Sequence, residues 1–548
     1  MNVNLILLIL FMMIVSNFEC VTCTFTPLIQ TKEGKLRGLR SISGQNRYYG
    51  IPYATSKRFQ SPQTPPKWSG IFTATRRYGS CSQIVSFLRF GREDCLELDV
   101  YTPESAKPGD KLAVLVFIHG GAYYYGSKWH YDPEFLVTKN VIVVIINYRV
   151  GVFGFVCLNN IANLGLKDHV AALKWIKRNI AAFGGDPDNV TISGQSAGAS
   201  AAAMHLLSKS SKGLFHKAIL LSGTPLAPWA FNVEQHKAIY EDLSKITTVD
   251  KEEDAYNILL NATVDDLLSS CADTSINPRG FKYSPCVDTN FTDSFFHDTP
   301  HNIISSGDFN KVPMINGYTS VEGVLFYGLN NEKTLNELDK QFVEKLPSVF
   351  SWCSKNDEEL IVKKLKKHYF RRKVITKSSV KGVVNFYSDW MAYSTSNAFS
   401  DLMVKHSDKP VYNYIFAYEG SRNFAKFLFG FGTDIDGASH SDDIFYIFKP
   451  GGMSLPLSSL DKLFIDRLTT MLTNFMKFGD PTPVKTDLLP VRWPATTSNR
   501  SLTMRLDQQL TVIDTPTSHR GQFFLNLLCD YGLRGYVPCE SKMMCNRR

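Results

Sequence analysis

The stretch Ser193-Gly194-Gln195-Ser196-Ala197-Gly198 organises the chain around one serine. The apolar, β-branched run Val190-Thr191-Ile192 precedes it, and a small-residue stretch suited to a helix, 197–207, follows it. This order predicts a strand, a sharp turn and a helix, with Ser196 at the apex. The glycines two residues before and after the serine leave room for a strained backbone that lifts its hydroxyl clear of the sheet. The helix N-terminus favours negative charge that develops beside Ser196.

Other apolar runs indicate a sheet around this turn. We expect strands over 98–101, 112–118, 141–146, 217–221, 312–315 and 411–417, and a helix over 171–183 that ends at Gly184-Gly185. Strands that alternate with helices are typical of a mostly parallel sheet flanked by helices. The predicted fold class is α/β, and the serine turn is typical of the α/β-hydrolase fold. Two polar segments, 235–309 and 330–377, are expected to be loop-rich insertions over the catalytic end of the sheet.

The composition is that of an ordinary globular protein. Of 548 residues, 44% are apolar and 20% are charged, so the chain can bury a large core. The net charge of +9 is densest over 363–373, which follows the acidic run Asp357-Glu358-Glu359. We interpret this cluster as a solvated helix face, because nucleic-acid binding requires a stronger basic bias and a recognisable module. No nucleic-acid partner is expected.

The N-terminus has the pattern of a secretory signal. An uncharged apolar run, Leu5 to Val15, opens the chain and is too short to span a membrane comfortably. We predict a signal peptide over 1–20, cleaved between Ser16 and Cys23, and a single domain over 24–548. The C-terminus is polar, which argues against a tail anchor. The expected location is extracellular, without a membrane anchor.

Cysteines and glycosylation sequons fit that location. Cys81 and Cys95 flank a short loop and form the best candidate disulfide. Sequence alone leaves open the pairing of Cys157, Cys271, Cys286, Cys353, Cys529, Cys539 and Cys545. Acceptor sequons lie at Asn261, Asn290 and Asn499. Asn189 also fits the pattern, but it adjoins the strand before Ser196 and is expected to be inaccessible.

A serine nucleophile needs donors for the oxyanion that forms when it attacks a carbonyl. The stretch His119-Gly120-Gly121-Ala122 directly follows the expected strand over 112–118. Its glycines allow backbone N–H groups to face the reacting carbonyl, although an ordinary glycine turn is the alternative. With the serine turn downstream, we predict an oxyanion hole formed by the N–H groups of Gly121, Ala122 and Ala197.

The serine also needs a base and an acid that orients the base. Several histidines follow Ser196, and an ordinary structural role is the alternative for each. His440 stands out because it lies in a small-residue loop, 436–443, after an expected strand. Many carboxylates could be the acid. Glu322 follows a buried strand and precedes Gly323, but the pattern alone does not select it.

Several motifs together resemble the type-B carboxylesterase and cholinesterase family. The matching stretches are Gly50-Ile51-Pro52-Tyr53-Ala54, Arg58-Phe59, Glu93-Asp94-Cys95-Leu96 with Val100, Asn147-Tyr148-Arg149 with Gly151, Phe183-Gly184-Gly185-Asp186-Pro187, and Gly194 to Gly198. Glu97 and Asp99 stand where the family usually has Tyr and Asn, and Gln195 replaces the commoner Glu. In having Gln195 beside the serine, the chain resembles insect juvenile hormone esterases and antennal esterases. His169, which follows Asp168, stands where the family usually has Gln.

The resemblance covers nearly all of the chain after the predicted signal. It implies an α/β-hydrolase with a catalytic triad of Ser196, Glu322 and His440, because Glu322-Gly323 and Gly437-x-x-His440 fall where the family carries its acid and base. It also implies a disulfide between Cys81 and Cys95. The implied activity is the hydrolysis of small to medium apolar carboxylic esters through an acyl-enzyme, with no metal or organic cofactor.

The family also contains members that have lost catalysis and serve in adhesion, so adhesion or binding is the alternative function. A second alternative is an enzyme with slow turnover, whose site acts mainly to sequester apolar esters. Cholinesterases hold a quaternary ammonium against a tryptophan in their first disulfide loop, and the loop between Cys81 and Cys95 contains none. Trp229 falls where relatives line the acyl side of the site, with plain core packing as its alternative role. We expect a general insect-type carboxylesterase of unassigned ester and oligomeric state.

Overall fold

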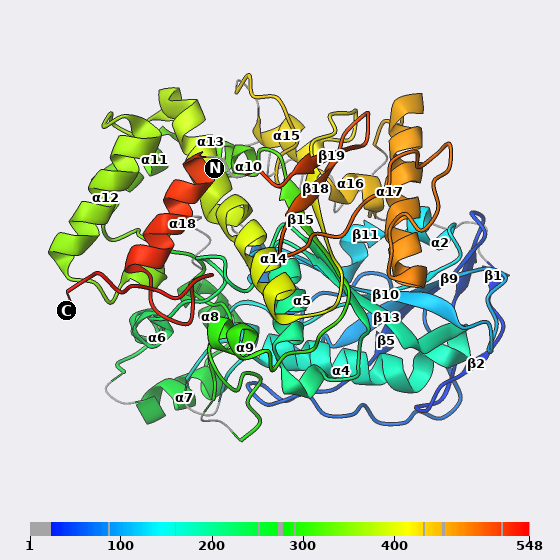
Figure 1. The fold of residues 1–548 in the computed structure, drawn as a ribbon. Helices are drawn as coiled ribbons and strands as arrows, with labels where there is room; N and C mark the ends of the chain where they lie inside the picture. The colour runs from blue at the N-terminus through cyan, green and yellow to red at the C-terminus, as the bar shows by residue number, and fades with distance from the viewer. Residues whose placement is uncertain are drawn as a thin grey trace.

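A twelve-stranded sheet forms the centre of the molecule in the computed structural model (Figure 1). The structure describes residues 24–85, 88–158, 161–249, 252–271, 278–289, 292–430, 433–451, 455–516 and 519–546. The predicted signal peptide and the Asn290 sequon lie outside these ranges. The strand order is β1-β4-β5-β9-β12-β10-β13-β14-β15-β16-β18-β19. The neighbours from β12 to β18 are parallel, and the pairs toward both edges are antiparallel.

The strands of this sheet are β1 (Thr24–Phe25), β4 (Leu39–Ser41), β5 (Gln45–Pro52), β9 (Glu97–Pro103), β10 (Leu112–Ile118), β12 (Ile142–Ile146), β13 (Gly185–Gln195), β14 (Lys217–Leu221), β15 (Met314–Thr319), β16 (Val411–Phe416), β18 (Leu502–Leu506) and β19 (Thr511–Asp514). Smaller sheets join β2 (Ile29–Gln30), β3 (Lys35–Arg37) and β6 (Ile71–Thr73), β7 (Gln83–Val85) and β8 (Leu88–Phe90), and β11 (Tyr131–Asp132) and β17 (Lys449–Pro450).

Helices cover both faces of the sheet because successive side chains of each central strand point to opposite faces. From β10, Val114, Val116 and Ile118 join the core shared with α4 (Leu164–Asn179) and α5 (Ala197–Leu206). The intervening Ala113, Leu115 and Phe117 join the core shared with α17 (Ser459–Phe478). Figure 1 shows α4 and α5 apart from α17, with the sheet between them. The expected α/β class, with a mostly parallel sheet flanked by helices, is confirmed.

Within the described residues, eight further helices lie outside the two segments that were expected to be loop-rich, 235–309 and 330–377. They are α2 (Glu134–Val137), α3 (Gly151–Phe155), α10 (Gly323–Leu329), α13 (Val380–Ser388), α14 (Ser394–His406), α15 (Phe424–Phe429), α16 (Ile444–Ile447) and α18 (His519–Tyr531).

The sequence placed most central strands well and misjudged the insertions. The strands expected over 112–118 and 217–221 are β10 and β14, whereas β15 starts and ends later than the expected 312–315. The predicted helix over 171–183 begins earlier, at Leu164, and ends in a 3₁₀ turn. The expected loop-rich insertions were wrong in part, because helices fill much of both: α6 (Gln235–Leu243), α7 (Glu252–Asn261), α8 (Val264–Ser270), α9 (Pro300–Ser306), α11 (Glu332–Lys340) and α12 (Lys355–Phe370).

Within the described residues, four disulfides tie these elements together. The structure joins Cys81 to Cys95, and it pairs six cysteines that the sequence left open: Cys157 with Cys286, Cys353 with Cys545, and Cys529 with Cys539. Cys271 is a buried free thiol. None of the helices in the described ranges is both long enough and apolar enough to cross a membrane.

The described sequons differ in accessibility. Asn261, at the end of α7, and Asn499 are exposed. Asn189 lies half-buried in β13, and its Oδ1 accepts a hydrogen bond from Lys217 Nζ at 2.5 Å.

Three buried histidines lie between β10, α4 and α5. The His119 ring stacks on Tyr148 with ring centroids 4.3 Å apart, and Tyr148 packs edge-on against His169. His169 Nδ1 lies 3.2 Å from His205 Nε2, and His205 Nδ1 lies 2.7 Å from Ser211 Oγ. Burial lowers the pKa of His119 and His205 to about 3 and that of His169 well below its usual value. The folded protein therefore holds these rings neutral.

This burial predicts a loss of stability in acid. Below about pH 6.5 the unfolded chain protonates His205 while the folded chain does not, so stability falls as pH drops from about 6.5 toward 3. In His205→Asn this contribution is absent. Between about pH 6 and about pH 4, urea denaturation should show the free energy of unfolding falling about 1 kcal/mol less per pH unit than in the wild type. Equal slopes would contradict a neutral buried His205.

Candidate active site

Ser196 lies in a strained turn at the end of β13, directly before α5. Its φ is 59° and its ψ is −126°, which places it outside the ordinary regions for a non-glycine residue. A Cβ on Gly194 would lie 2.3 Å from the carbonyl carbon of Gly198, and one on Gly198 would lie 2.2 Å from Ile118 O. Only glycine fits at these two positions, so the turn that presents Ser196 depends on both.

Three backbone N–H groups near this turn are available as donors. Gly121 and Ala122 follow β10 with φ values of 112° and 56°, and Ala197 is the first residue of α5. Within the described part of the chain, none of these three N–H groups donates a hydrogen bond to another residue. Unpaired donors at a helix N-terminus and in an adjacent glycine turn suit a developing oxyanion.

Glu322 and His440 form a buried hydrogen-bonded pair through Glu322 Oε2 and His440 Nδ1. Glu322 precedes α10, and its Oε1 accepts hydrogen bonds from Ser222 Oγ at 2.6 Å and Thr319 N at 2.7 Å. Both side chains are almost fully buried. These contacts fix the carboxylate, which in turn fixes the imidazole with its Nε2 facing away from Glu322.

The side of the imidazole away from Glu322 faces the serine turn. Gln195, which directly precedes Ser196, places its Nε2 3.1 Å from His440 Nε2 and donates a 2.9 Å hydrogen bond to Ser441 Oγ. This contact brings the end of β13 and the His440 loop together. A histidine oriented by a carboxylate beside a serine at a strained turn can act as a general base.

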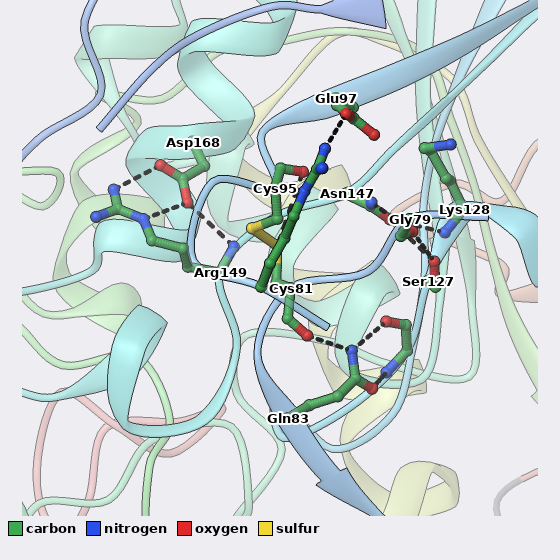
Figure 2. Close-up of a disulfide and its surroundings, with 12 residues drawn as sticks. Gly79, Cys81, Gln83, Cys95, Glu97, Ser127, Lys128, Asn147, Arg149 and Asp168 are labelled. Carbon is green, nitrogen blue, oxygen red and sulfur yellow. Dashed lines mark hydrogen bonds and ion pairs between the residues drawn. A yellow bond between two sulfur atoms is a disulfide. The ribbon is translucent and has the colours of Figure 1, made fainter. Parts of the chain in front are cut away.

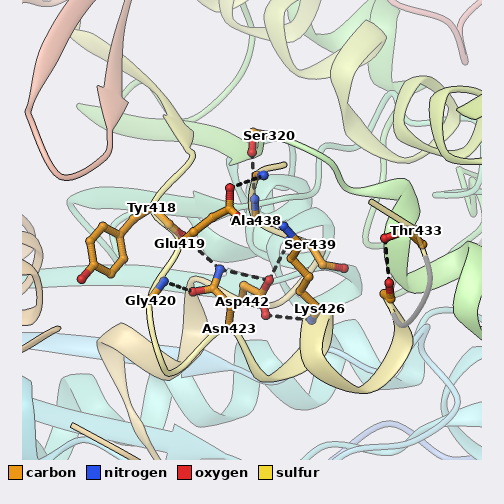
Figure 3. Close-up of polar contacts among 12 residues, drawn as sticks. Ser320, Tyr418, Glu419, Gly420, Asn423, Lys426, Thr433, Ala438, Ser439 and Asp442 are labelled. Carbon is orange, nitrogen blue, oxygen red and sulfur yellow. Dashed lines mark hydrogen bonds and ion pairs between the residues drawn. The ribbon is translucent and has the colours of Figure 1, made fainter. Parts of the chain in front are cut away.

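Asp442 holds the loop that carries His440 (Figure 3). Its Oδ2 accepts hydrogen bonds from Ser439 N at 2.7 Å and Asn423 Nδ2 at 3.3 Å, and its Oδ1 accepts from Ala425 N at 2.9 Å and Lys426 N at 3.2 Å. The carboxylate is fully buried. It therefore ties the His440 loop to the first turn of α15.

Neighbouring contacts fix the start of this loop. Ala438 N donates to Ser320 Oγ at 2.9 Å, and Gly437 N donates to Glu419 Oε1 at 2.5 Å. Burial raises the pKa of Asp442 to about 7, and burial together with Glu322 raises that of Asp443 to about 7.

Five aromatic rings in successive contact run from Tyr123, which follows Gly121 and Ala122, to the His440 ring. We define this aromatic wall as Tyr123, Trp229, Phe281, Trp390 and Phe326. Successive ring centroids lie 5.5 to 6.4 Å apart, and Phe326 lies 5.8 Å from the His440 ring. Trp229 is fully buried, and its Nε1 donates to Met391 O at 2.8 Å. Trp229 is therefore a fixed element of this wall.

The structure brings the sequence-predicted site residues to one end of the sheet. Sequence reasoning missed Ser222 as a partner of Glu322 and Asp442 as the anchor of the His440 loop. Ser222 directly follows the predicted strand over 217–221, and Asp442 lies two residues after His440. Their positions next to a predicted strand end and a predicted site residue are the signals that could have identified them. In the described ranges, no group of three or more His, Cys, Asp or Glu side chains is arranged to hold a metal ion.

The strand order, with a strained serine turn after a central parallel strand, defines the α/β-hydrolase class. The crystal structure of juvenile hormone esterase from Manduca sexta, with OTFP covalently attached, superposes with a TM-score of 0.81. It is 26% identical, and the match covers 92% of this chain and 99% of that chain.

Sequence comparisons give the family. The model of the carboxylesterase family matches residues 26–524. Esterase FE4 of Myzus persicae is 32% identical over 96% of this chain and 98% of its own length. Juvenile hormone esterase of Tribolium castaneum is 31% identical over 85% of this chain and 86% of its own length. The chain belongs to the carboxylesterase family and is a carboxylic-ester hydrolase, so the adhesion alternative is not favoured.

The Asp442 contacts predict a large effect of its removal. Asp442→Ala would leave three backbone N–H groups, two of them buried, without an acceptor, and we expect a loss of about 3 kcal/mol of stability. Asp436→Ala is the control, because Asp436 lies exposed in the same loop and should change stability by less than about 0.5 kcal/mol. Urea denaturation measures both. A loss of stability in Asp442→Ala as small as that in Asp436→Ala would show that Asp442 does not anchor the loop.

Proposed function

We propose that Ser196, Glu322 and His440 form the catalytic triad of this ester hydrolase. The buried Glu322–His440 pair beside the Ser196 turn is the observation that carries the proposal. The unpaired N–H groups of Gly121, Ala122 and Ala197 support their role as the oxyanion hole. Each such donor contributes about 3 kcal/mol to transition-state stabilisation.

In the proposed mechanism, Ser196 Oγ attacks the ester carbonyl carbon while His440 Nε2 accepts the hydroxyl proton. The carbonyl oxygen becomes an oxyanion that the three N–H groups bind. The tetrahedral intermediate collapses, and His440 returns the proton to the departing alcohol, which leaves an acyl-enzyme. Water then attacks the acyl carbon, His440 takes its proton, and the acid is released with Ser196 restored. Glu322 stays ionised and stabilises the imidazolium formed in each step.

We infer that the substrates are small to medium esters with apolar acyl groups. The aromatic wall supports this class, because it gives the site buried apolar rings between the proposed donors, Gly121 and Ala122, and His440. The relatives include juvenile hormone esterases and esterases FE4 and E4 at 31% to 33% identity, a range too narrow to favour one ester. The absence of tryptophan between Cys81 and Cys95 argues against acetylcholine.

We also propose that the protein is secreted after cleavage of residues 1–20, and that 24–548 is a single domain. The four disulfides of the described residues and the name of one relative, venom carboxylesterase-6 of Apis mellifera, support an extracellular location. The exposed positions of Asn261 and Asn499 support glycosylation there. Asn290 is a third proposed glycosylation site.

Mass spectrometry of the secreted protein after exposure to an organophosphate tests the triad. The activated serine oxygen displaces the leaving group from phosphorus, so we expect one adduct per molecule on the peptide that contains Ser196. The same spectra report the mature N-terminus and the glycans on Asn261, Asn290 and Asn499.

Two variants separate the nucleophile from its surroundings. Ser196→Ala should fold normally, form no adduct and lose ester hydrolysis by more than about 1000-fold. Ser200→Ala, in the same buried helix, should keep the adduct. An adduct on Ser196→Ala, or none on the folded wild type, would overturn the assignment of the nucleophile.

The aromatic wall predicts a change in acyl preference when Trp229 becomes smaller. Trp229→Leu opens space beside the site, so kcat/KM for a long acyl group relative to acetyl, with the same alcohol, should rise about tenfold. Trp175→Leu is the matched control, because Trp175 is equally buried but lies in α4 outside the wall. It should change stability without changing the ratio. An unchanged ratio in Trp229→Leu would assign Trp229 to core packing alone.

A further inference from the structure

The proposed oxyanion donors lie in a loop whose backbone is strained. Gly121, Ala122, Tyr123 and Gly126 all have φ in the left-handed region, between 56° and 131°. Non-glycine residues adopt this region at a free-energy cost of about 1 kcal/mol or more each. The loop from Gly120 to Gly126, which we call the oxyanion loop, therefore keeps its shape only if contacts around it impose that shape.

The two ends of the oxyanion loop lie against each other. A Cβ on Gly126 would lie 2.2 Å from His119 Nδ1 and 2.6 Å from Gly120 O. Within the loop, the N–H groups of Tyr124 and Tyr125 donate to Gly121 O at 2.9 and 3.1 Å. A displacement of Gly126 would therefore also displace the Gly120–Gly121 and Gly121–Ala122 peptide groups.

One buried side chain holds Gly126. Gln83 Oε1 accepts a hydrogen bond from Gly126 N at 2.9 Å, and Gln83 Nε2 donates to Gly126 O at 3.0 Å. Nε2 also donates to Cys81 O at 2.9 Å, so both hydrogens of the amide are used. Gln83 is only 1% exposed. Figure 2 shows this side chain next to the Cys81–Cys95 disulfide.

Gln83 is itself held in place by a rigid frame. The disulfide fixes Cys81, whose carbonyl receives the Gln83 amide. Ser127 Oγ and Asn147 Nδ2 donate to Gly79 O at 2.7 and 2.8 Å, which binds the chain after the oxyanion loop to the chain before the disulfide (Figure 2).

A buried ion pair completes this frame. Lys128 Nζ lies 2.7 Å from Asp99 Oδ1 and donates to Arg77 O at 3.0 Å, with both charged side chains fully buried. The segment from Arg77 to Gln83 therefore cannot move independently of the residues that follow the oxyanion loop.

We propose that Gln83 is a positioning residue for ester hydrolysis, which clamps Gly126 so that the N–H groups of Gly121 and Ala122 point at the oxyanion. The inference rests on the proposed function of those donors. Among the described residues, no hydrogen bond joins Gln83 to Ser196 or His440, so Gln83 acts through Gly126. Because the oxyanion exists only after Ser196 attacks, loss of the clamp weakens binding of the transition state more than binding of the ester.

The test compares Gln83→Glu and Gln83→Ala with the wild type by steady-state kinetics and by inhibition with a trifluoromethyl ketone. In the inhibited enzyme, Ser196 Oγ bonds to the ketone carbon, its proton moves to His440, and the ketone oxygen becomes the oxyanion. We expect kcat to fall about 10- to 100-fold, KM to change less than about twofold, and the inhibition constant of the ketone to rise by the same factor as kcat falls.

The Gln83→Glu variant adds a pH readout. Its protonated carboxyl can both accept from Gly126 N and donate to Gly126 O, as the amide does, whereas its carboxylate cannot donate. The ratio of variant kcat to wild-type kcat should therefore rise as pH is lowered. A ratio that stays constant or falls with decreasing pH would overturn the clamp.

Asn163→Asp is the matched control. Asn163 also clamps one residue through both amide atoms, accepting from Cys286 N at 3.0 Å and donating to Cys286 O at 2.8 Å beside the Cys157–Cys286 disulfide. It is equally buried. Asn163→Asp should lower the melting temperature as Gln83→Glu does, but leave kcat and ketone inhibition within about twofold of the wild type.

Titration of the reactive serine with an organophosphate corrects every kcat for the fraction of folded, active enzyme. If kcat per titrated site is unchanged in Gln83→Glu and Gln83→Ala, Gln83 only stabilises the fold and the proposal is wrong. If Gln83→Ala does not fold, the pH dependence of the ratio of Gln83→Glu kcat to wild-type kcat tests the proposal by itself. An absence of any adduct on Ser196 in the wild type would instead contradict the proposed function, which keeps the two failures distinct.

Discussion

The site depends on the strained backbone of Ser196, which the sheet and the following helix hold in place. Ser196 N donates to Leu221 O at 2.8 Å, and Ser196 O accepts from Ala199 N and Ser200 N at 2.9 and 3.0 Å. Strain of this kind costs about 1 to 3 kcal/mol and persists only where surrounding contacts over-determine the conformation. Here both backbone groups of the residue are hydrogen-bonded, so the hydroxyl is presented while the main chain stays fixed.

The parallel register of the central strands places the other groups of the site at the same edge of the sheet as Ser196. Ile118 lies opposite Gly194, Gln195 opposite Leu221, and Leu221 opposite Gly317. Because these strands run in one direction, the segments that follow them emerge side by side. The oxyanion loop follows β10, the serine turn follows β13, and the segments that carry Ser222 and Glu322 follow β14 and β15. Adjacent strands thus supply successive parts of one site.

Buried polar side chains give the loops at this edge the rigidity of the sheet. The Asp442 carboxylate holds the His440 loop, and the Gln83 amide holds Gly126, each through several hydrogen bonds to backbone groups. Buried groups with satisfied hydrogen bonds specify a single geometry, because an alternative arrangement would leave them unpaired in a low-dielectric interior. Loops that would otherwise be mobile can therefore hold the proposed donors and the proposed base at fixed positions.

The sequence by itself determined the α/β class, the central strands and the turn around Ser196, because each depends on neighbouring residues or a short hydrophobic period. Family resemblance was needed to select Glu322 among many carboxylates. Only the tertiary structure placed Glu322 against His440, 118 positions away, and revealed Ser222, Asp442 and Gln83 as anchors. Such contacts are made by strand order and loop packing, and no local pattern in one sequence records which distant polar groups will meet.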